Sequence, residues 1–143
     1  LTSVISGCSP EPEVQPPDST LVAMDNIDPC GDELLETTAT PLTSLMEIFD
    51  DGADIAANSP HEQLAEPIAN LQALRREAED LEVPICLAKL KTAQIDYMNS
   101  VIDTLLMFLS LQDEDVVMVG VEISDELRAI YETQVSEIFG TEP

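Results

Sequence analysis

The sequence predicts an all-α protein: a four-helix up-and-down antiparallel bundle preceded by a disordered N-terminal tether. Apolar residues make up 44% of the 143 residues, which is enough to build one buried core. Aromatic residues make up only 3% and tryptophan is absent, so this core must consist of the aliphatic side chains that fill helical bundles. From residue 41 onward, apolar residues recur at intervals of three and four, the period of a helix that buries one face.

The N-terminal segment contains Ile5-Ser6-Gly7-Cys8, an aliphatic residue and two small residues before a cysteine. This run resembles the lipobox of bacterial and archaeal lipoproteins, at which a signal peptide is cleaved. The resemblance implies that residues 1–7 are a signal-peptide remnant and that Cys8 is the lipidation site. It also implies that the protein is exported and lipid-anchored in the cell envelope, in the periplasm or on the outer face of the membrane. An ordinary buried or free cysteine is the alternative.

Residues 8–40 are expected to form a Pro-rich, acidic tether with a partly ordered lead-in from residue 21. Four prolines between Ser9 and Thr20 favour extended polyproline geometry. At roughly 3 Å per residue, this spacer reaches about 35 Å and lifts a domain of residues 41–143 clear of lipid headgroups. Acyl chains on Cys8 would stabilise membrane attachment by about 0.8 kcal/mol per buried methylene.

The first helix is predicted at residues 42–57, because Thr40-Pro41 offers an N-cap and a first-turn proline. A second helix is predicted to begin at Ser59-Pro60, since Ser59 and Glu62 have the spacing of a reciprocal capping box. Pro67 would kink this helix in its second turn. The expected buried stripe of the first helix is Leu42, Leu45, Phe49, Ala53 and Ala56, and that of the second is Leu64, Ile68, Leu71, Leu74, Ala78 and Leu81.

The third helix is predicted to follow Pro84 and to be the central one, because its apolar seam is broad. The fourth is predicted to follow the acidic run 112–115 and to end at Gly140. Residues 116–123 are rich in β-branched side chains and also allow a strand, but a helix is preferred because one strand would have no partner. The expected seam of the third helix is Ile95, Met98, Ile102, Leu105 and Leu109, and that of the fourth is Ile123, Leu127, Ile130 and Ile138.

The segment "LQALRREAEDLEVPICLAKLKTAQIDYMNSVIDTLLMFL" joins a charged helix, a Val-Pro-x-Cys junction and a helix with a Tyr-Met pair. This order resembles small helical-bundle lipoproteins of bacteria, over residues 60–140 at most. The resemblance carries over no catalytic residue.

Cys30 and Cys86 remain as one even pair once Cys8 is assigned to lipid. In an oxidising compartment such a pair is a disulfide candidate. A bridge across about 56 residues is worth at most about 4 kcal/mol in the chain-entropy model. Two buried free thiols are the alternative.

The charge balance is strongly acidic, with 29 acidic and 5 basic residues and a net charge of -24. A polyanionic surface repels nucleic acid and favours basic proteins or cations as partners. The alternative is a surface that serves only solubility, and a salty habitat would also suit such a balance. Four of the five cations are expected at one end of the bundle, either as a basic recognition patch or in local pairs with carboxylates: Arg75, Arg76, Lys89 and Lys91.

The sequence predicts no catalytic residue, no metal site and no cofactor, and the protein is not expected to be an enzyme. His61 is the only histidine, without the Glu-x-x-His spacing of di-iron bundles, and is expected to be solvated. The acids of Asp25–Glu33 do not fall at EF-hand positions. Neither a Gly-x-Ser-x-Gly motif nor a glycine-rich phosphate loop occurs.

These features together predict a membrane-tethered extracytoplasmic lipoprotein that acts as a non-catalytic binding or structural helical module with a strongly acidic surface. The alternative is a helical bundle that holds a ligand or a metal cation, with the broad Met and Leu face of the third helix lining a pocket. The oligomeric state stays open, because an over-apolar helix also allows dimerisation.

Overall fold

The computed structural model of the chain describes residue 28 and residues 30–140. Four α-helices and two short 3-10 helices make up this part, without a strand: α1 (Asp32–Ala57), η1 (His61–Gln63), α2 (Ala65–Asp80), η2 (Ile85–Leu87), α3 (Ala88–Leu109) and α4 (Glu114–Phe139). The predicted all-α class is confirmed, and residues 116–123 are helical within α4. The predicted signal-peptide remnant, Cys8 and the Pro-rich spacer lie outside the described residues.

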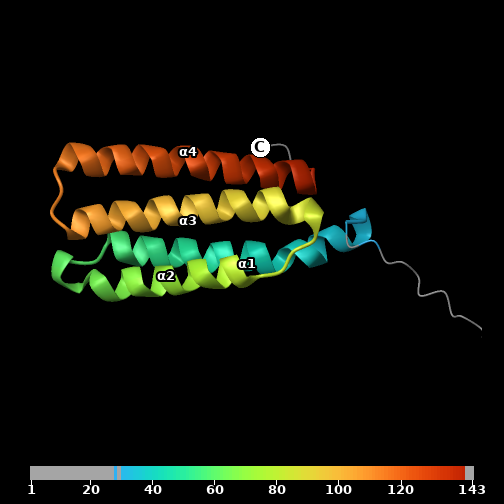
Figure 1. Cartoon of the computed structure of the whole chain (residues 1–143), viewed down its shortest axis with the longest axis horizontal. Helices are drawn as coiled ribbons and strands as arrows, with labels where there is room; N and C mark the ends of the chain where they lie inside the picture. Colours follow the sequence, from blue (N-terminus) through green and yellow to red (C-terminus); the bar gives the residue numbers. More distant parts are fainter. Residues whose placement is uncertain (1–27, 29, 141–143) are drawn as a thin grey trace, which may run out of the picture.

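The central element of the arrangement is α3. Figure 1 shows the four α-helices side by side with their long axes roughly aligned, and α3 lies between α4 and the pair formed by α1 and α2. Helices α1, α2 and α3 all contact one another, whereas α4 packs mainly against α3. The prediction that the third helix is central is therefore confirmed. None of the described helices combines the length and the hydropathy needed to cross a bilayer.

The core follows the predicted apolar stripes of the first three helices. Within α3, Met98 and Ile102 are buried and the other seam residues are half-buried. Phe49 of α1 packs edge-on against the Tyr97 ring of α3, with 6.1 Å between ring centroids. The largest fully buried apolar side chains come from α1, α2, η2, α3 and the residue before α2: Phe49, Leu42, Leu64, Leu71, Leu87, Leu90 and Met98.

The predicted start of the first helix is wrong, because α1 begins at Asp32 rather than at residue 42. Residues 32–40 are therefore helical rather than part of a lead-in. Leu35 is half-buried and Ala39 is fully buried, so the apolar stripe continues toward the N-terminus at helical spacing. Pro41, expected at the first turn, lies inside α1 on its exposed face, and the Thr40 hydroxyl donates to the Glu36 carbonyl at 2.9 Å.

The predicted capping box at Ser59 is also absent from the structure. The Ser59 hydroxyl instead donates to the Ile55 carbonyl at 2.7 Å and so completes the end of α1. The chain then forms η1, and α2 begins only at Ala65 without a side-chain cap. Pro67 consequently falls in the first turn of α2, where its missing N–H removes no helical hydrogen bond, so the expected kink is not required.

The predicted stripe of the fourth helix is wrong at two positions. Ile123 and Ile130 are 47% and 51% exposed, although Leu127 and Ile138 are half-buried as expected. The buried residues of α4 are instead Gly120, Ser124 and Tyr131, and the first two contact α3 at Thr104 and Ser100. Because α4 packs mainly on α3 alone, it buries one narrow face and leaves part of its aliphatic surface in water.

Candidate functional site

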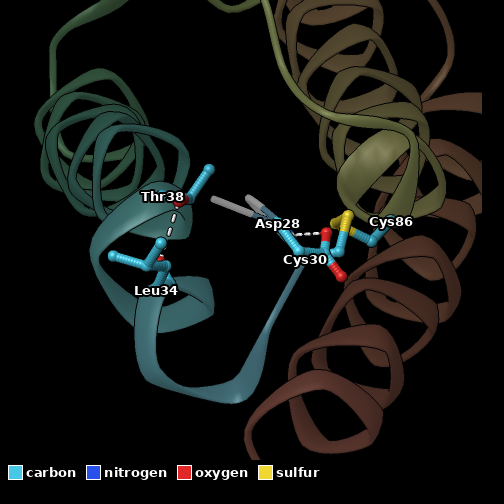
Figure 2. Close-up of a disulfide and its surroundings, with 5 residues drawn as sticks. All are labelled: Asp28, Cys30, Leu34, Thr38 and Cys86. Carbon is cyan, nitrogen blue, oxygen red and sulfur yellow. Dashed lines mark hydrogen bonds between the residues drawn. A yellow bond between two sulfur atoms is a disulfide. The ribbon is translucent and has the colours of Figure 1, made fainter. Parts of the chain in front are cut away.

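A disulfide joins Cys30, just before α1, to Cys86 in η2. Their Cα atoms are 5.9 Å apart across a sequence separation of 56 residues. Figure 2 shows the bond beside Asp28, whose carboxylate accepts a hydrogen bond from the Cys30 backbone N–H at 2.9 Å. The predicted pairing is confirmed, and it pins the start of α1 to the α2–α3 junction.

Two of the four cations predicted as a candidate basic patch are bonded to neighbouring groups. Arg75 pairs with Glu79 one turn later at 2.8 Å. The Lys91 ammonium donates to the carbonyls of Glu79 and Leu81 at 2.6 and 2.7 Å, and so satisfies orphan acceptors at the end of α2. Arg76 and Lys89 are exposed. Local pairing with a carboxylate, the alternative that the sequence left open, therefore holds for Arg75, whereas Lys91 bonds backbone carbonyls instead.

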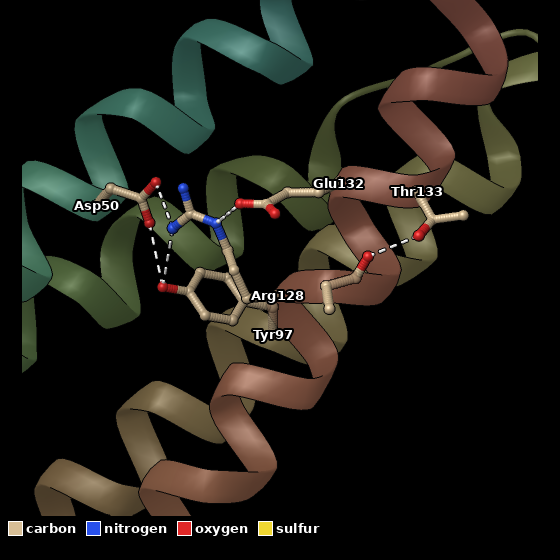
Figure 3. Close-up of polar contacts among 6 residues, drawn as sticks. Asp50, Tyr97, Arg128, Glu132 and Thr133 are labelled. Atoms are coloured by element: carbon tan, nitrogen blue, oxygen red, sulfur yellow. Dashed lines mark hydrogen bonds and ion pairs between the residues drawn. The ribbon is translucent and has the colours of Figure 1, made fainter. Parts of the chain in front are cut away.

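The fifth cation, Arg128, forms a polar cluster that the sequence analysis missed. Its guanidinium pairs with Asp50 of α1 at 2.8 Å and with Glu132 of α4 at 3.0 Å. Tyr97 of α3 donates its hydroxyl to Asp50 at 3.2 Å and accepts from Arg128 at 3.3 Å. Figure 3 shows the three helices meeting at these side chains, which we call the Arg128 cluster: Asp50, Tyr97, Arg128 and Glu132. The sequence signal for this cluster was weak, since only the four-residue spacing of Arg128 and Glu132 is local.

Partial burial governs the electrostatics of this region. Desolvation raises the pKa of Asp50 above its usual range, against the opposing effect of Arg128. Desolvation likewise raises the pKa of Tyr97. Burial, with the nearby Asp50 charge, raises the pKa of Tyr131 to about 12. The Tyr97 hydroxyl and the charged groups of the cluster bond to one another, so the arrangement joins α1, α3 and α4.

The contact between α3 and α4 is close because small side chains meet there. A Cβ added at Gly120 would lie 2.5 Å from the Thr104 hydroxyl oxygen. One turn further along α4, the Ser124 hydroxyl lies 2.9 Å from that of Ser100 and donates to the Gly120 carbonyl. Since Gly120 meets Thr104 and Ser124 meets Ser100, the two helices run antiparallel at this contact.

Two adjacent surface depressions of about 390 and 360 Å³ follow the α3–α4 boundary. Both contain Asp96 in their walls, which makes them neighbouring parts of one groove. Ile123 and Ile130, the two residues that the predicted core stripe placed wrongly, line it from α4. We call this feature the α3/α4 groove.

His61 differs from its expected role as a solvated residue. It is half-buried, with its Nε2 atom 3.0 Å from the Leu109 carbonyl at the end of α3 and its ring edge-on to Phe108. It therefore fixes η1 against α3. Across residue 28 and residues 30–140, no group of three or more His, Cys, Asp or Glu side chains is placed to hold a metal ion.

No protein-family model, curated protein or solved structure matches this chain.

Proposed function

We propose that the protein is a membrane-tethered, extracytoplasmic lipoprotein that acts as a non-catalytic binding or structural module. The observation that carries the proposal is the Cys30–Cys86 disulfide. Disulfides persist in secreted, periplasmic and surface proteins, whereas cytosolic thiols are kept reduced. The pairing therefore supports an exported protein.

The lipobox-like run Ile5-Ser6-Gly7-Cys8 supplies the anchor in this proposal. Lipid on Cys8 attaches the protein to the membrane, and two or more acyl chains on one residue give stable attachment. The Pro-rich spacer after Cys8 holds the helical domain away from the headgroups.

The contacts of the helical domain favour binding over catalysis. In the Arg128 cluster, Asp50 and Tyr97 are held by hydrogen bonds that join three helices. The net charge of -24 favours basic proteins or cations as partners and opposes binding to nucleic acid. The module would thus present an acidic surface outside the membrane.

Lipid labelling in a bacterial host tests this proposal. Residues 1–143 are expressed behind the positively charged start and apolar segment of a lipoprotein signal peptide, and the cells are fed an alkyne fatty acid. We expect label on the wild-type protein and on Cys86→Ser, and none on Cys8→Ala. Equal labelling of Cys8→Ala, or no labelling of the exported wild type, would contradict lipidation at Cys8.

A further inference from the structure

The outer side of α4 carries an apolar strip that no described element covers. Its residues are spaced by three, four and seven, which places them on one face of the helix. Each is about half exposed, at 43, 53, 47 and 51% in chain order. We call these residues the α4 strip: Val116, Val119, Ile123 and Ile130.

Ile123 and Ile130 of the strip line the α3/α4 groove, whose other wall is acidic. Asp96 and Asp103 line the groove from α3 and are both exposed. On the far side of the strip, the exposed Glu126 lies three residues after Ile123 and four before Ile130, so it flanks them on the helix surface. The apolar strip therefore runs between carboxylates from both helices.

The groove is long enough for a helix. Its α3 wall runs from Ala88 to Met107, which at 1.5 Å per residue is about 28 Å. A helix of about 19 residues has that length. Among the described residues that line it, Lys89 at one end is the only cation.

We propose that the α3/α4 groove binds a basic amphipathic helix of a partner protein. This inference rests on the proposed function as a binding module and names its surface and its class of partner. Apolar side chains of the partner, repeated at three and four residues, would pack on the α4 strip, as in other helix-in-groove complexes. Lysines or arginines along the edges would meet Asp96, Asp103 and Glu126.

Charge decides between this partner and a second copy of the chain. Two copies would each bring a net charge of -24 and would place acidic walls against acidic walls. A cationic helix instead meets opposite charge on both sides of the strip, which favours encounter and fixes orientation.

The first test uses the full 143-residue chain in solution and an 18-residue Leu/Lys peptide whose leucines fall on one helix face. A scrambled peptide of the same composition is the control, because it keeps the charge and loses the apolar face. Titration followed by fluorescence anisotropy should show binding of the amphipathic peptide at least about tenfold tighter than of the scrambled one, weakening with salt. Equal binding of both peptides, or no binding, would overturn the proposal.

The second test locates the site with surface variants, whose folding is checked by circular dichroism. The triple variant Val119→Ser, Ile123→Ser, Ile130→Ser should weaken binding about tenfold, whereas Met118→Ser with Val121→Ser, exposed elsewhere on α4, should not. The double variant Asp96→Asn with Asp103→Asn should weaken binding about threefold at low salt and should have no effect in about 0.5 M salt. The control double variant Asp51→Asn with Glu77→Gln, whose residues do not line the groove, should not weaken binding at either salt concentration. Wild-type affinity in the strip variant would overturn the assignment.

Light scattering after size-exclusion chromatography measures the oligomeric state and tests whether a second copy of the chain occupies the groove. The wild type should be monomeric in the absence of peptide, and a dimer that the strip variant abolishes would show that a second copy occupies the groove. Lipidation at Cys8 plays no part in these solution experiments. Failure of groove binding and failure of the lipoprotein proposal are therefore separate results.

Discussion

Arg128 of α4 forms an ion pair with Asp50 of α1, with 2.8 Å between Nη1 and Oδ2. The two helices pack on α3, and Tyr97 of α3 bonds to both partners. The Arg128 guanidinium also lies over the Tyr97 ring, 5.4 Å from its centroid. The pair therefore links α4 to α1 as well as to α3.

Replacement of Arg128 by Gln should destabilise the protein by about 1 to 2 kcal/mol, because it leaves a partly buried Asp50 carboxylate without its cation. The side chain of Arg128 is 37% exposed, so solvent screening keeps the loss below that of a buried pair. Urea unfolding measures the change. Arg75→Gln is the matched control and should lose less than about 0.5 kcal/mol, because the Glu79 carboxylate that it leaves unpaired is more exposed than Asp50, at 40% against 26%.

A double-mutant cycle of Arg128→Gln with Asp50→Asn separates the pair from its surroundings. We expect a coupling free energy of about 1 kcal/mol or more between these positions. Additive effects of the two substitutions would contradict the structural role given to this ion pair.

Replacement of Gly120 by Ala should destabilise the protein by about 1 to 2 kcal/mol, although Ala is the better helix former. The new methyl group would fall 2.5 Å from the Thr104 hydroxyl and force α3 and α4 apart. Thermal unfolding measures the loss. Gly52→Ala is the matched control, since its methyl group would meet only the side chain of Leu71, at 3.0 Å, and the loss there should be smaller.

Both tyrosines should ionise above the ordinary value of 10.0 in the folded protein, Tyr131 near 12 and Tyr97 also raised. The native state then binds more protons than the unfolded chain, so the free energy of unfolding falls as pH rises from about 10 through 12. Absorbance at 295 nm should show displaced midpoints that return to about 10 in guanidinium. Native midpoints at the ordinary value would contradict the described burial of both rings.

Loss of the disulfide in Cys30→Ser with Cys86→Ser should destabilise the protein by up to about 4 kcal/mol, because the unfolded chain regains the freedom of a 56-residue loop. Urea unfolding with and without reductant gives the value. Reductant should change the wild type and leave the double variant unaffected. A wild type indifferent to reductant would show that the bond is not formed in solution.

The sequence was informative about the helices and about the cysteine pairing. Spacing of threes and fours predicted the four helices and the buried stripes of the first three, and the cysteine count predicted the disulfide. Pro41 was misleading, since proline is frequent at helix starts. In the structure α1 extends on the N-terminal side of Pro41, where Ala39 is fully buried. The spacing of Ser59 and Glu62 was misleading too, because the Ser59 hydroxyl is used at the end of α1.

The remaining features depend on contacts between distant segments. Asp50, Tyr97 and Arg128 come from three helices, and nothing in their local sequence indicates that they meet. Likewise, the apolar residues of α4 exceed what α3 covers, so spacing alone could not tell Ile123 and Ile130, which are exposed, from Leu127, which packs on the core. These two exposed isoleucines of α4 line the α3/α4 groove.

The intact mass of the protein after membrane extraction tests the lipoprotein proposal most directly. The protein and a Cys8→Ala control are each expressed behind the positively charged start and apolar segment of a lipoprotein signal peptide. Mass spectrometry then gives their intact masses with and without reductant. We predict a chain that begins at Cys8, carries acyl chains, and gains the mass of two hydrogen atoms when reductant cleaves the Cys30–Cys86 disulfide. An unmodified mass with three free thiols would contradict both the anchor and the exported location.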